Sequence, residues 1–305
     1  MGWTASFGRL RRNFLLSGLV AAAATLAGPA TASAIGELDQ KAGTDGCIYQ
    51  GGASGMCEDG NGVGDTDSVV SPDGQSVYTV SFNQGTLAVL DRDPVTGNLE
   101  QKPGAAGCFK DDGLAANGCT STPRLLKAVG VAISPDGENV YVTSFDKLAL
   151  TIFDRDTSTG ALTLKSGPEG CLDGGSSGFC NTVVAMGRPD KLAVSPNGLN
   201  VYVIGGDLAN SMIVLDRDPT TGELEQKPGT DGCISETGSG GLCVDGKGLN
   251  LPEGIAMSPD GETVVSSSRG DEVAIFQRDL TTGELTQDSG VEGCYSESGS
   301  AGECQ

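Results

Sequence analysis

The chain has 305 residues, of which 48 are glycine and 5% are aromatic, and its formal net charge is −21. Histidine is absent, which excludes a serine–histidine–acid triad and a histidine-ligated zinc site. Residues 1–34 hold three arginines and no acid, so the rest carries 16 basic against 40 acidic residues, a net charge of −24. Such a charge repels nucleic acid and anionic membrane, whose binding needs clustered Lys and Arg.

Residues 1–34 are typical of an export signal. Arg9, Arg11 and Arg12 precede a short apolar run, residues 14–27, and Ala32-Ser33-Ala34 fits the small-residue cleavage pattern. We expect cleavage after Ala34 and a secreted or extracytoplasmic protein, with an uncleaved anchor as the alternative. The arginine pair resembles a twin-arginine signal but follows leucine rather than Ser or Thr, so the Sec and twin-arginine routes both stay open.

Ten cysteines form five close pairs with nearly constant spacing. An even count behind an export signal predicts disulfides, whereas metal sites favour two-residue spacing and a reducing compartment. Each short closed loop contributes about 2–3 kcal/mol in the chain-entropy model. The predicted bridges are Cys47–Cys57, Cys108–Cys119, Cys171–Cys180, Cys233–Cys243 and Cys294–Cys304.

The chain repeats itself about every 62 residues, which indicates a stacked or radial array. A Ser-Pro-Asp-Gly turn begins at Ser71, Ser134, Ser195 (with Asn for Asp) and Ser258. An Asp-Arg-Asp turn begins at Asp91, Asp154, Asp216 and Gln277 (with Gln for the first Asp). We expect one repeat domain over 35–305, with repeats at 36–97, 98–160, 161–222, 223–283 and a partial copy at 284–305.

Each copy contains four strand-like runs bounded by turn residues. In the second copy they are residues 131–133, 140–142, 150–153 and 162–164. Pro-Asp-Gly favours a tight reversal between the first two, because proline presets φ and glycine accepts a positive φ. Four antiparallel strands per repeat are the unit of a β-propeller blade, so the predicted fold class is all-β.

The Ser-Pro-Asp-Gly turn, the Val-Tyr-Val strand and the Asp-Arg-Asp turn resemble the YVTN and lactonase-type propellers, which include 6-phosphogluconolactonase-like proteins. The resemblance covers residues 36–305 and implies blades, usually seven in a closed ring. This chain has four units of the first three strands but five fourth strands, which begin near Leu38, Leu99, Leu162, Leu224 and Leu285. We expect an incomplete or truncated array, with a small closed ring or a homodimer that completes the ring as alternatives.

A residue present in every copy is needed by every blade, so its simplest role is structural. This applies to the Asp-Arg-Asp carboxylates as turn formers and to Tyr78, Tyr141 and Tyr202 as packing residues. A site is expected where residues depart from the repeat, on long loops of a rigid scaffold. Charged departures precede the first strand or follow the second: Asp65, Asp67, Lys127, Asp146, Lys147, Arg188, Asp190, Lys191, Asp207, Glu253, Arg269 and Asp271. A solvated rim with incidental charges is the alternative.

Two loops, 59–62 and 245–248, resemble cation loops but lack the full calcium-binding series. We therefore expect no metal or other cofactor, with calcium as the exception to test. The sequence favours an exported binding or scaffold module whose partner is a small polar ligand or a cell-surface polymer or protein. The alternative, implied by the resemblance, is a hydrolase or cyclase acting on a sugar or muconate-type lactone. The absence of histidine leaves such an enzyme only Asp, Glu, Lys and Arg.

Overall fold

The computed structural model describes residues 39–114, 117–175 and 178–305, of which residues 41–305 form one compact unit. The expected leader, residues 1–34, and the strand expected near Leu38 lie outside the described residues. Within the described ranges the secondary structure consists of strands and short 3-10 turns, as the predicted all-β class requires. No helix in these ranges is long and apolar enough to cross a membrane.

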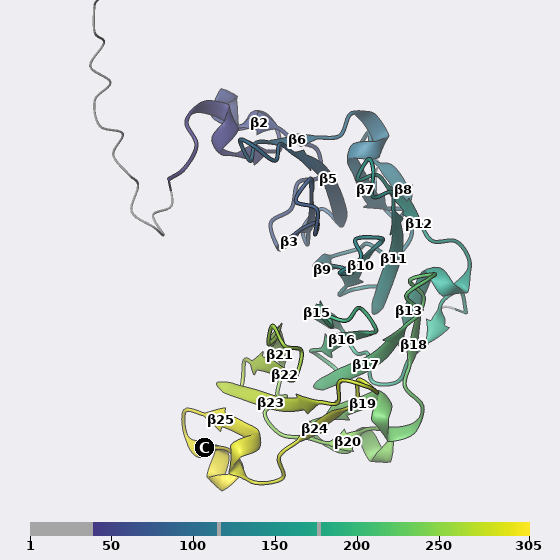
Figure 1. The fold of residues 1–305 in the computed structure, drawn as a ribbon, viewed down its shortest axis with the longest axis vertical. Helices are drawn as coiled ribbons and strands as arrows, with labels where there is room; N and C mark the ends of the chain where they lie inside the picture. Colours follow the sequence, from purple (N-terminus) through teal and green to yellow (C-terminus); the bar gives the residue numbers. More distant parts are fainter. Residues whose placement is uncertain (1–38, 115–116, 176–177) are drawn as a thin grey trace, which may run out of the picture. The chain divides into compact units, whose positions relative to one another are not determined.

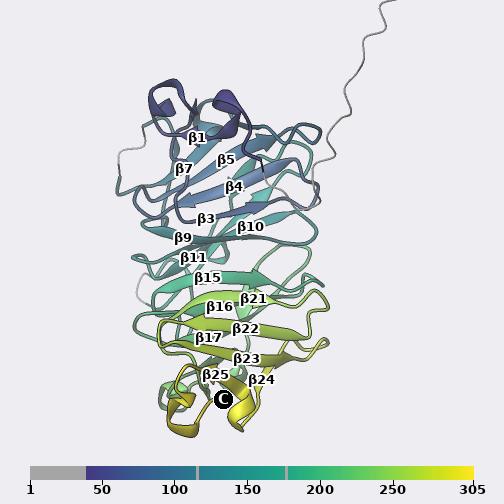
Figure 2. The same cartoon turned by 90° about the vertical axis from the view of Figure 1, so that its left-hand side faces the viewer.

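Four large sheets follow one another along the chain (Figures 1 and 2). The first contains β3 (Asp67–Val70), β4 (Ser76–Ser81), β5 (Thr86–Arg92), β6 (Leu99–Gln101), β7 (Cys108–Asp111) and β8 (Thr120–Thr122). The second contains β9 (Ala128–Ile133), β10 (Asn139–Ser144), β11 (Ala149–Arg155), β12 (Leu162–Leu164), β13 (Cys171–Asp173) and β14 (Asn181–Thr182). The third contains β15 (Pro189–Val194), β16 (Asn200–Gly205), β17 (Ser211–Arg217), β18 (Leu224–Gln226), β19 (Cys233–Ser235) and β20 (Val244–Asp245). The fourth contains β21 (Pro252–Met257), β22 (Thr263–Ser268), β23 (Glu272–Arg278), β24 (Leu285–Gln287) and β25 (Cys294–Ser296).

The remaining elements are short. A two-stranded parallel sheet joins β1 (Ile48–Tyr49) to β2 (Glu58–Asp59). The 3-10 helices are η1 (Gly43–Gly46), η2 (Gly52–Gly55), η3 (Gly104–Gly107), η4 (Pro168–Gly170), η5 (Gly229–Gly232), η6 (Gly238–Gly241), η7 (Val291–Gly293) and η8 (Gly299–Gly302).

The outer edge of each blade is more elaborate than the four-strand prediction. In the second blade, β12 and β13 both pair antiparallel with β11, at its end and at its beginning, and η4 separates them. The predicted fourth strand is therefore split in two, and β14 adds a parallel strand beside β13. Each sequence repeat begins with a segment such as β12, which pairs with the third strand of the repeat before it. A blade therefore contains parts of two consecutive sequence repeats. Residues 284–305 accordingly complete the edge of the fourth blade.

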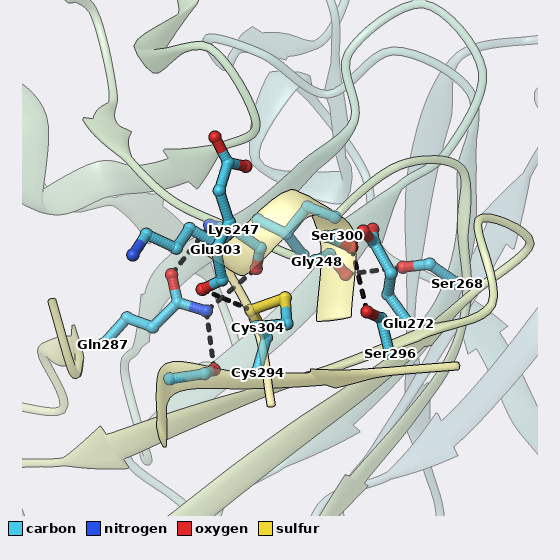
Figure 3. The surroundings of a disulfide bond; sticks show 12 residues. Lys247, Gly248, Ser268, Glu272, Gln287, Cys294, Ser296, Ser300, Glu303 and Cys304 are labelled. Atoms are coloured by element: carbon cyan, nitrogen blue, oxygen red, sulfur yellow. Dashed lines mark hydrogen bonds between the residues drawn. A yellow bond between two sulfur atoms is a disulfide. The ribbon is translucent and has the colours of Figure 1, made fainter. Parts of the chain in front are cut away.

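All five predicted disulfides are formed. Four of them lie at the outer edges of blades, where each ties the start of a short strand to the end of its own loop, and Cys47–Cys57 lies beside the separate sheet of β1 and β2. Figure 3 shows the last of them, Cys294–Cys304, beside Gln287 of β24. The Gln287 side chain donates to the backbone oxygens of Lys247 (2.8 Å) and Gly293 (2.9 Å) and accepts from the Lys247 N–H (2.8 Å). This glutamine fastens the edge of the fourth blade to the connection that leads into that blade from the third.

The core lies between successive sheets as three apolar clusters. One cluster joins the first two blades and includes Tyr78, Val140 and Phe153, all fully buried. The innermost strands also contact one another in order, β3 with β9, β9 with β15 and β15 with β21. The interior blades are therefore buried on both faces, as the nearly continuous burial along β10, β11, β16 and β17 shows.

A buried arginine bonds each blade to the one before it. Arg155 of the second blade donates from Nε to the Tyr78 hydroxyl (2.6 Å) and forms an ion pair with Asp73 (2.7 Å). Tyr78 in turn donates to the backbone oxygen of Gly160 (2.8 Å). Arg217 with Tyr141, and Arg278 with Tyr202, repeat this contact. The repeated tyrosines therefore serve packing, as predicted, and the arginine of the Asp-Arg-Asp turn has a structural role that the sequence did not reveal.

Candidate functional site

Two loops of every blade meet at the end opposite the Ser-Pro-Asp-Gly turns. One loop leads into the innermost strand, and the other joins the second strand to the third. Five residues before each Ser-Pro turn stand Thr66, Val129, Asp190 and Glu253. Directly after the second strands stand Phe82, Phe145, Gly206 and Arg269. These two repeat positions change from blade to blade while the strands around them stay alike.

These positions line a hollow of about 370 Å³. A smaller space of about 40 Å³ adjoins it and shares four of its residues. The larger hollow is lined by Thr66, Phe82, Val129, Phe145, Asp190, Lys191, Glu253 and Arg269. The fold therefore brings together Asp190, Lys191, Glu253 and Arg269 from the predicted set, which come from the third and fourth blades.

Asp190 is the unusual acid of this hollow. Burial raises the pKa of Asp190 to about 6, the Lys191 ammonium opposes the shift, and the Glu253 carboxylate adds to it. A carboxyl group with a pKa near 6 exchanges its proton close to neutral pH, as a general acid or base must. Asp190 lies in β15 at an irregularity of the strand, between Pro189 and Leu192, which both pair with β16. The Thr143 hydroxyl donates to the backbone oxygen of Asp190 at 2.5 Å.

Lys191 is held firmly beside Asp190. Its ammonium donates to the backbone oxygens of Val129 (2.6 Å) and Thr66 (3.3 Å) and forms an ion pair with Asp67 (3.3 Å). The Asp67 carboxylate also accepts the Val131 N–H at 3.2 Å. Lys191 thus links three blades and places a fixed positive charge at the floor of the hollow.

The rim carries three opposed charge pairs from the predicted set. Arg269 contacts Glu253 directly, and their side chains are 65% and 44% exposed. The others are Lys127 with Asp146 (2.9 Å) and Arg188 with Asp207 (3.4 Å). Exposed pairs contribute little to stability, so these charges are free to exchange partners when a ligand arrives.

Two aromatic residues were missed by the sequence reasoning. Phe82 and Phe145 pack edge to face, with ring centroids 5.8 Å apart. Lys127 lies 5.2 Å from the Phe82 ring and Arg188 lies 4.8 Å from the Phe145 ring, so both cations are held by cation–π contacts. The signal was present: the residue after the second strand reads Phe, Phe, Gly and Arg along the chain. The predicted site included only charged departures from the repeat, so these two phenylalanines were left out.

The other predicted residues lie outside the hollow. The carboxylate of Asp65 accepts the Phe82 N–H (3.1 Å) and a bond from Asn83 (2.7 Å), so it supports the loop that carries Phe82. Burial acts to raise the pKa of Asp65, but hydrogen bonds from Asn83 and neighbouring groups outweigh it and lower the pKa. Lys147 pairs instead with buried Asp111 (3.4 Å).

The two loops that resemble cation sites give no test of calcium. Asp59 accepts the N–H of Gly51, a residue of the adjacent Cys47–Cys57 loop, at 2.7 Å. Over residues 39–114, 117–175 and 178–305, no group of three or more acidic or cysteine side chains is arranged to hold a metal ion. The expectation of no cofactor, with calcium as the exception, therefore stays a prediction.

No protein-family profile matches the sequence, and no curated protein matches it. Solved structures do match. They include a protein of Bacteroides fragilis provisionally described as a 6-phosphogluconolactonase (17% identity, TM-score 0.55, covering 79% of this chain and 59% of that one). They also include a periplasmic gluconolactonase of Pseudomonas aeruginosa (18%, 0.51, 73% and 52%) and a protein of Lactobacillus plantarum (17%, 0.51, 75% and 57%).

The chain spans little more than half the length of these proteins. At such identities the likeness concerns the fold. The predicted resemblance is confirmed at that level: the described residues fold as propeller blades like those of these solved structures.

Proposed function

We propose that this protein hydrolyses a lactone in the hollow around Asp190. The observation that carries the proposal is a carboxyl group with a pKa of about 6 that lies among two cations, a second acid and two phenylalanines. The names of two solved neighbours, a gluconolactonase and a provisional 6-phosphogluconolactonase, favour this function over a non-catalytic scaffold. The sugar or muconate-type lactone of the sequence-based alternative is the substrate class we propose.

The chemistry requires one base and one oxyanion partner. The Asp190 carboxylate takes a proton from water as the water oxygen bonds to the lactone carbonyl carbon. The guanidinium of Arg269, released from Glu253, donates to the oxygen that becomes negative. Lys191 is committed to Thr66, Val129 and Asp67, so it acts through its charge. When the ring C–O bond breaks, the leaving oxygen takes the proton from Asp190, and a hydroxy acid is released.

The test is turnover by purified, oxidised protein. We expect acid release from glucono-1,5-lactone, its 6-phosphate or muconolactone above the spontaneous rate, with kcat rising through pH 6 as Asp190 loses its proton. Asp190→Asn should lower kcat by about 100-fold or more, the usual contribution of a general base. The matched control is Asp91→Asn, since Asp91 is exposed and pairs with Lys102 (2.5 Å) far from the hollow.

Two results would count against the proposal. An Asp190→Asn protein with the wild-type rate removes Asp190 from the chemistry. Absence of turnover on all three lactones, together with binding of a polar ligand that Asp190→Asn alters, restores the non-catalytic binding module as the better account.

The compartment follows from the cysteines. Five disulfides require an oxidising environment to form and persist. We infer a secreted or extracytoplasmic protein, exported by the Sec or the twin-arginine route. Detection of the protein outside the cytoplasm, with an N-terminus at residue 35, tests both the compartment and the expected cleavage.

A further inference from the structure

A second hollow lies at the outer edge of the second blade. Its volume is about 230 Å³, and its walls are mainly apolar. It belongs to the edge formed by β12 and β13, on a different part of the blade from the loops around Asp190. Its principal lining residues are Pro123, Arg124, Leu164, Gly170, Cys171 and Phe179.

A glutamine occupies the corresponding place in the other three blades. Gln101 of β6 accepts the Asn61 N–H (2.7 Å) and donates to the backbone oxygens of Asn61 (2.6 Å) and Gly107 (2.8 Å). Gln226 makes the same three bonds to Val184 and Gly232. Gln287 repeats them in the fourth blade, where Figure 3 shows it next to the disulfide. A polar clamp thus fastens the edge wherever this glutamine is present.

The second blade lacks this clamp, because both the glutamine and the residue whose N–H it accepts are replaced. Leu164 stands where the other blades have glutamine, and Pro123 stands where they have Asn61, Val184 or Lys247. Proline has no N–H to give, so even a glutamine could not form the full clamp here. The two departures occur together, and the hollow lies between them. This is the same sign that marks the site at the loop end: residues that break the repeat line a cavity.

Two cationic residues line this mainly apolar hollow, Arg124 and Lys165, and the Lys165 ammonium already pairs with Asp154 at 2.9 Å. Arg124 has a left-handed backbone with φ 67°, a conformation that its repeat equivalents reach with glycine or with Ala185 (φ 58°). Among the described residues, the one ion pair of Arg124 is long, 3.9 Å to Asp173, and its Nε is buried with no hydrogen-bond partner. A long cation held in a strained conformation with a donor unused is costly for stability alone. A ligand that accepts from this guanidinium accounts for its presence.

We propose that the hollow binds a small, mostly apolar carboxylate, with its ring or chain against Leu164, Pro123 and Phe179 and its anionic group toward Arg124. The volume suits this class, since an apolar cavity of roughly 150 Å³ already takes up benzene. Arginine is the side chain best matched to carboxylate geometry. The site stands independently of the activity proposed for Asp190.

The experiment uses 4-fluorobenzoate and fluorobenzene as probes, with ¹⁹F NMR to measure binding to the oxidised protein. A double variant, Pro123→Asn with Leu164→Gln, places the residues of the first blade in the second blade, so it is expected to fold. It should abolish binding of both probes by filling the hollow. Arg124→Ala copies Ala185, which tolerates the same backbone conformation. It should weaken 4-fluorobenzoate at least tenfold and leave fluorobenzene unchanged.

Each outcome decides the question. Wild-type preference for the carboxylate, lost in Arg124→Ala and absent in the double variant, supports the site. Equal binding to wild type and double variant overturns it, as does absence of binding by wild type at millimolar probe. Circular dichroism of both variants checks that the blades are intact. Lactone turnover is expected to persist in both, so a failure of this site is distinguishable from a failure of the proposed hydrolase.

Discussion

The two ends of each blade differ in how they use the repeat. At the turn end, Ser-Pro-Asp-Gly and Asp-Arg-Asp recur in nearly every copy, and their side chains bond one blade to the next. At the loop end, equivalent positions hold Thr, Val, Asp and Glu in turn, and they line a hollow. Repeated residues therefore hold the blades together, whereas residues that depart from the repeat form the candidate site.

The fourth blade lacks the tyrosine that bonds the other blades to their neighbours. Valine stands at 265, where the first three blades carry the bonding tyrosine. Val273 and Tyr295 are 39% and 49% exposed, whereas Leu87 and Phe109, their equivalents in the first blade, are buried. No blade follows the fourth among the described residues. The face of the fourth blade that carries Val273 and Tyr295 accordingly has no bonding tyrosine and is only partly buried. The turn-end contact is thus specific to junctions between blades.

The largest expected effect is loss of a junction arginine. Arg217 is 3% exposed and bonds to Tyr141, Gly198, Asp136 and Asn139. Arg217→Ala removes four hydrogen bonds from the junction, three of them to buried groups, and it should lower the free energy of unfolding by about 3–5 kcal/mol. Urea denaturation under oxidising conditions measures it.

The matched control for that variant is in the first blade. Arg92 stands at the same repeat position, and among the described residues its guanidinium bonds only to the Gly74 oxygen (2.9 Å). Arg92→Ala should cost about 1 kcal/mol or less. Equal costs for the two variants would mean that the junction contact contributes nothing beyond one surface hydrogen bond.

The next effect concerns the disulfides of the outer edge. Replacing Cys233 and Cys243 by serine removes a bridge between residues ten apart in sequence. The free energy of unfolding should fall by about 2–3 kcal/mol, because the unfolded chain gains loop entropy. Thermal denaturation with and without reductant measures the change, and reductant should have less effect on the variant than on wild type. A variant as stable as wild type contradicts the account of the edge.

A smaller effect follows from the titration of Asp73. Burial acts to raise its pKa, but bonds from Ser71, the Gln75 N–H and Arg155 outweigh burial and lower the pKa to about 2. Because the folded pKa is depressed, the stabilisation is present above pH 4 and is lost as pH falls toward 2. Solvent reaches this carboxylate, so we expect about 1 kcal/mol.

The variant Asp73→Asn tests that effect without disrupting the junction, since Asn197 fills the same position in the third blade. It should flatten the dependence of stability on pH between 4 and 2. Acid denaturation curves for wild type and variant make the comparison. Parallel curves for the two proteins over this range contradict the assignment.

The smallest expected effect on stability is at the loop end. Since burial raises the folded pKa of Asp190 to about 6, its stabilising contribution is present below pH 4 and is lost as pH rises through 6. Asp190→Asn removes a charge that is unfavourable at pH 8, so this variant should be at least as stable as wild type there. A clearly less stable variant would give Asp190 a structural role. Melting temperatures at pH 5 and pH 8 suffice.

The sequence predicted the blades and the disulfides because both depend on local patterns. Strand-like runs, turn residues and cysteine spacing are all visible within one repeat. The junction arginines escaped prediction because Arg155 and Tyr78 are 77 residues apart in sequence. The split outer strand escaped as well, since a 3-10 turn such as η4 leaves no periodic signal.

The candidate site was predicted only in part, because the sequence shows which positions depart from the repeat but not which of them are buried. Counting back from each Ser-Pro turn identified Asp190, Lys191 and Glu253 as departures from the repeat. It could not show which charges are buried, so nothing singled out Asp190 before the fold placed it beside Lys191. Phe82 and Phe145 required a comparison of apolar as well as charged positions.

The most direct test of the contrast between the two ends is an NMR titration of the aspartate side-chain carboxyl carbons in wild type and Asp190→Asn. The turn aspartates, such as Asp93 and Asp218, accept backbone hydrogen bonds that lower their pKa values, so they should titrate below the ordinary range. One aspartate should titrate near pH 6 and vanish in the variant. A wild-type spectrum in which every aspartate titrates below pH 5 would contradict the central claim that the loop end holds the reactive acid.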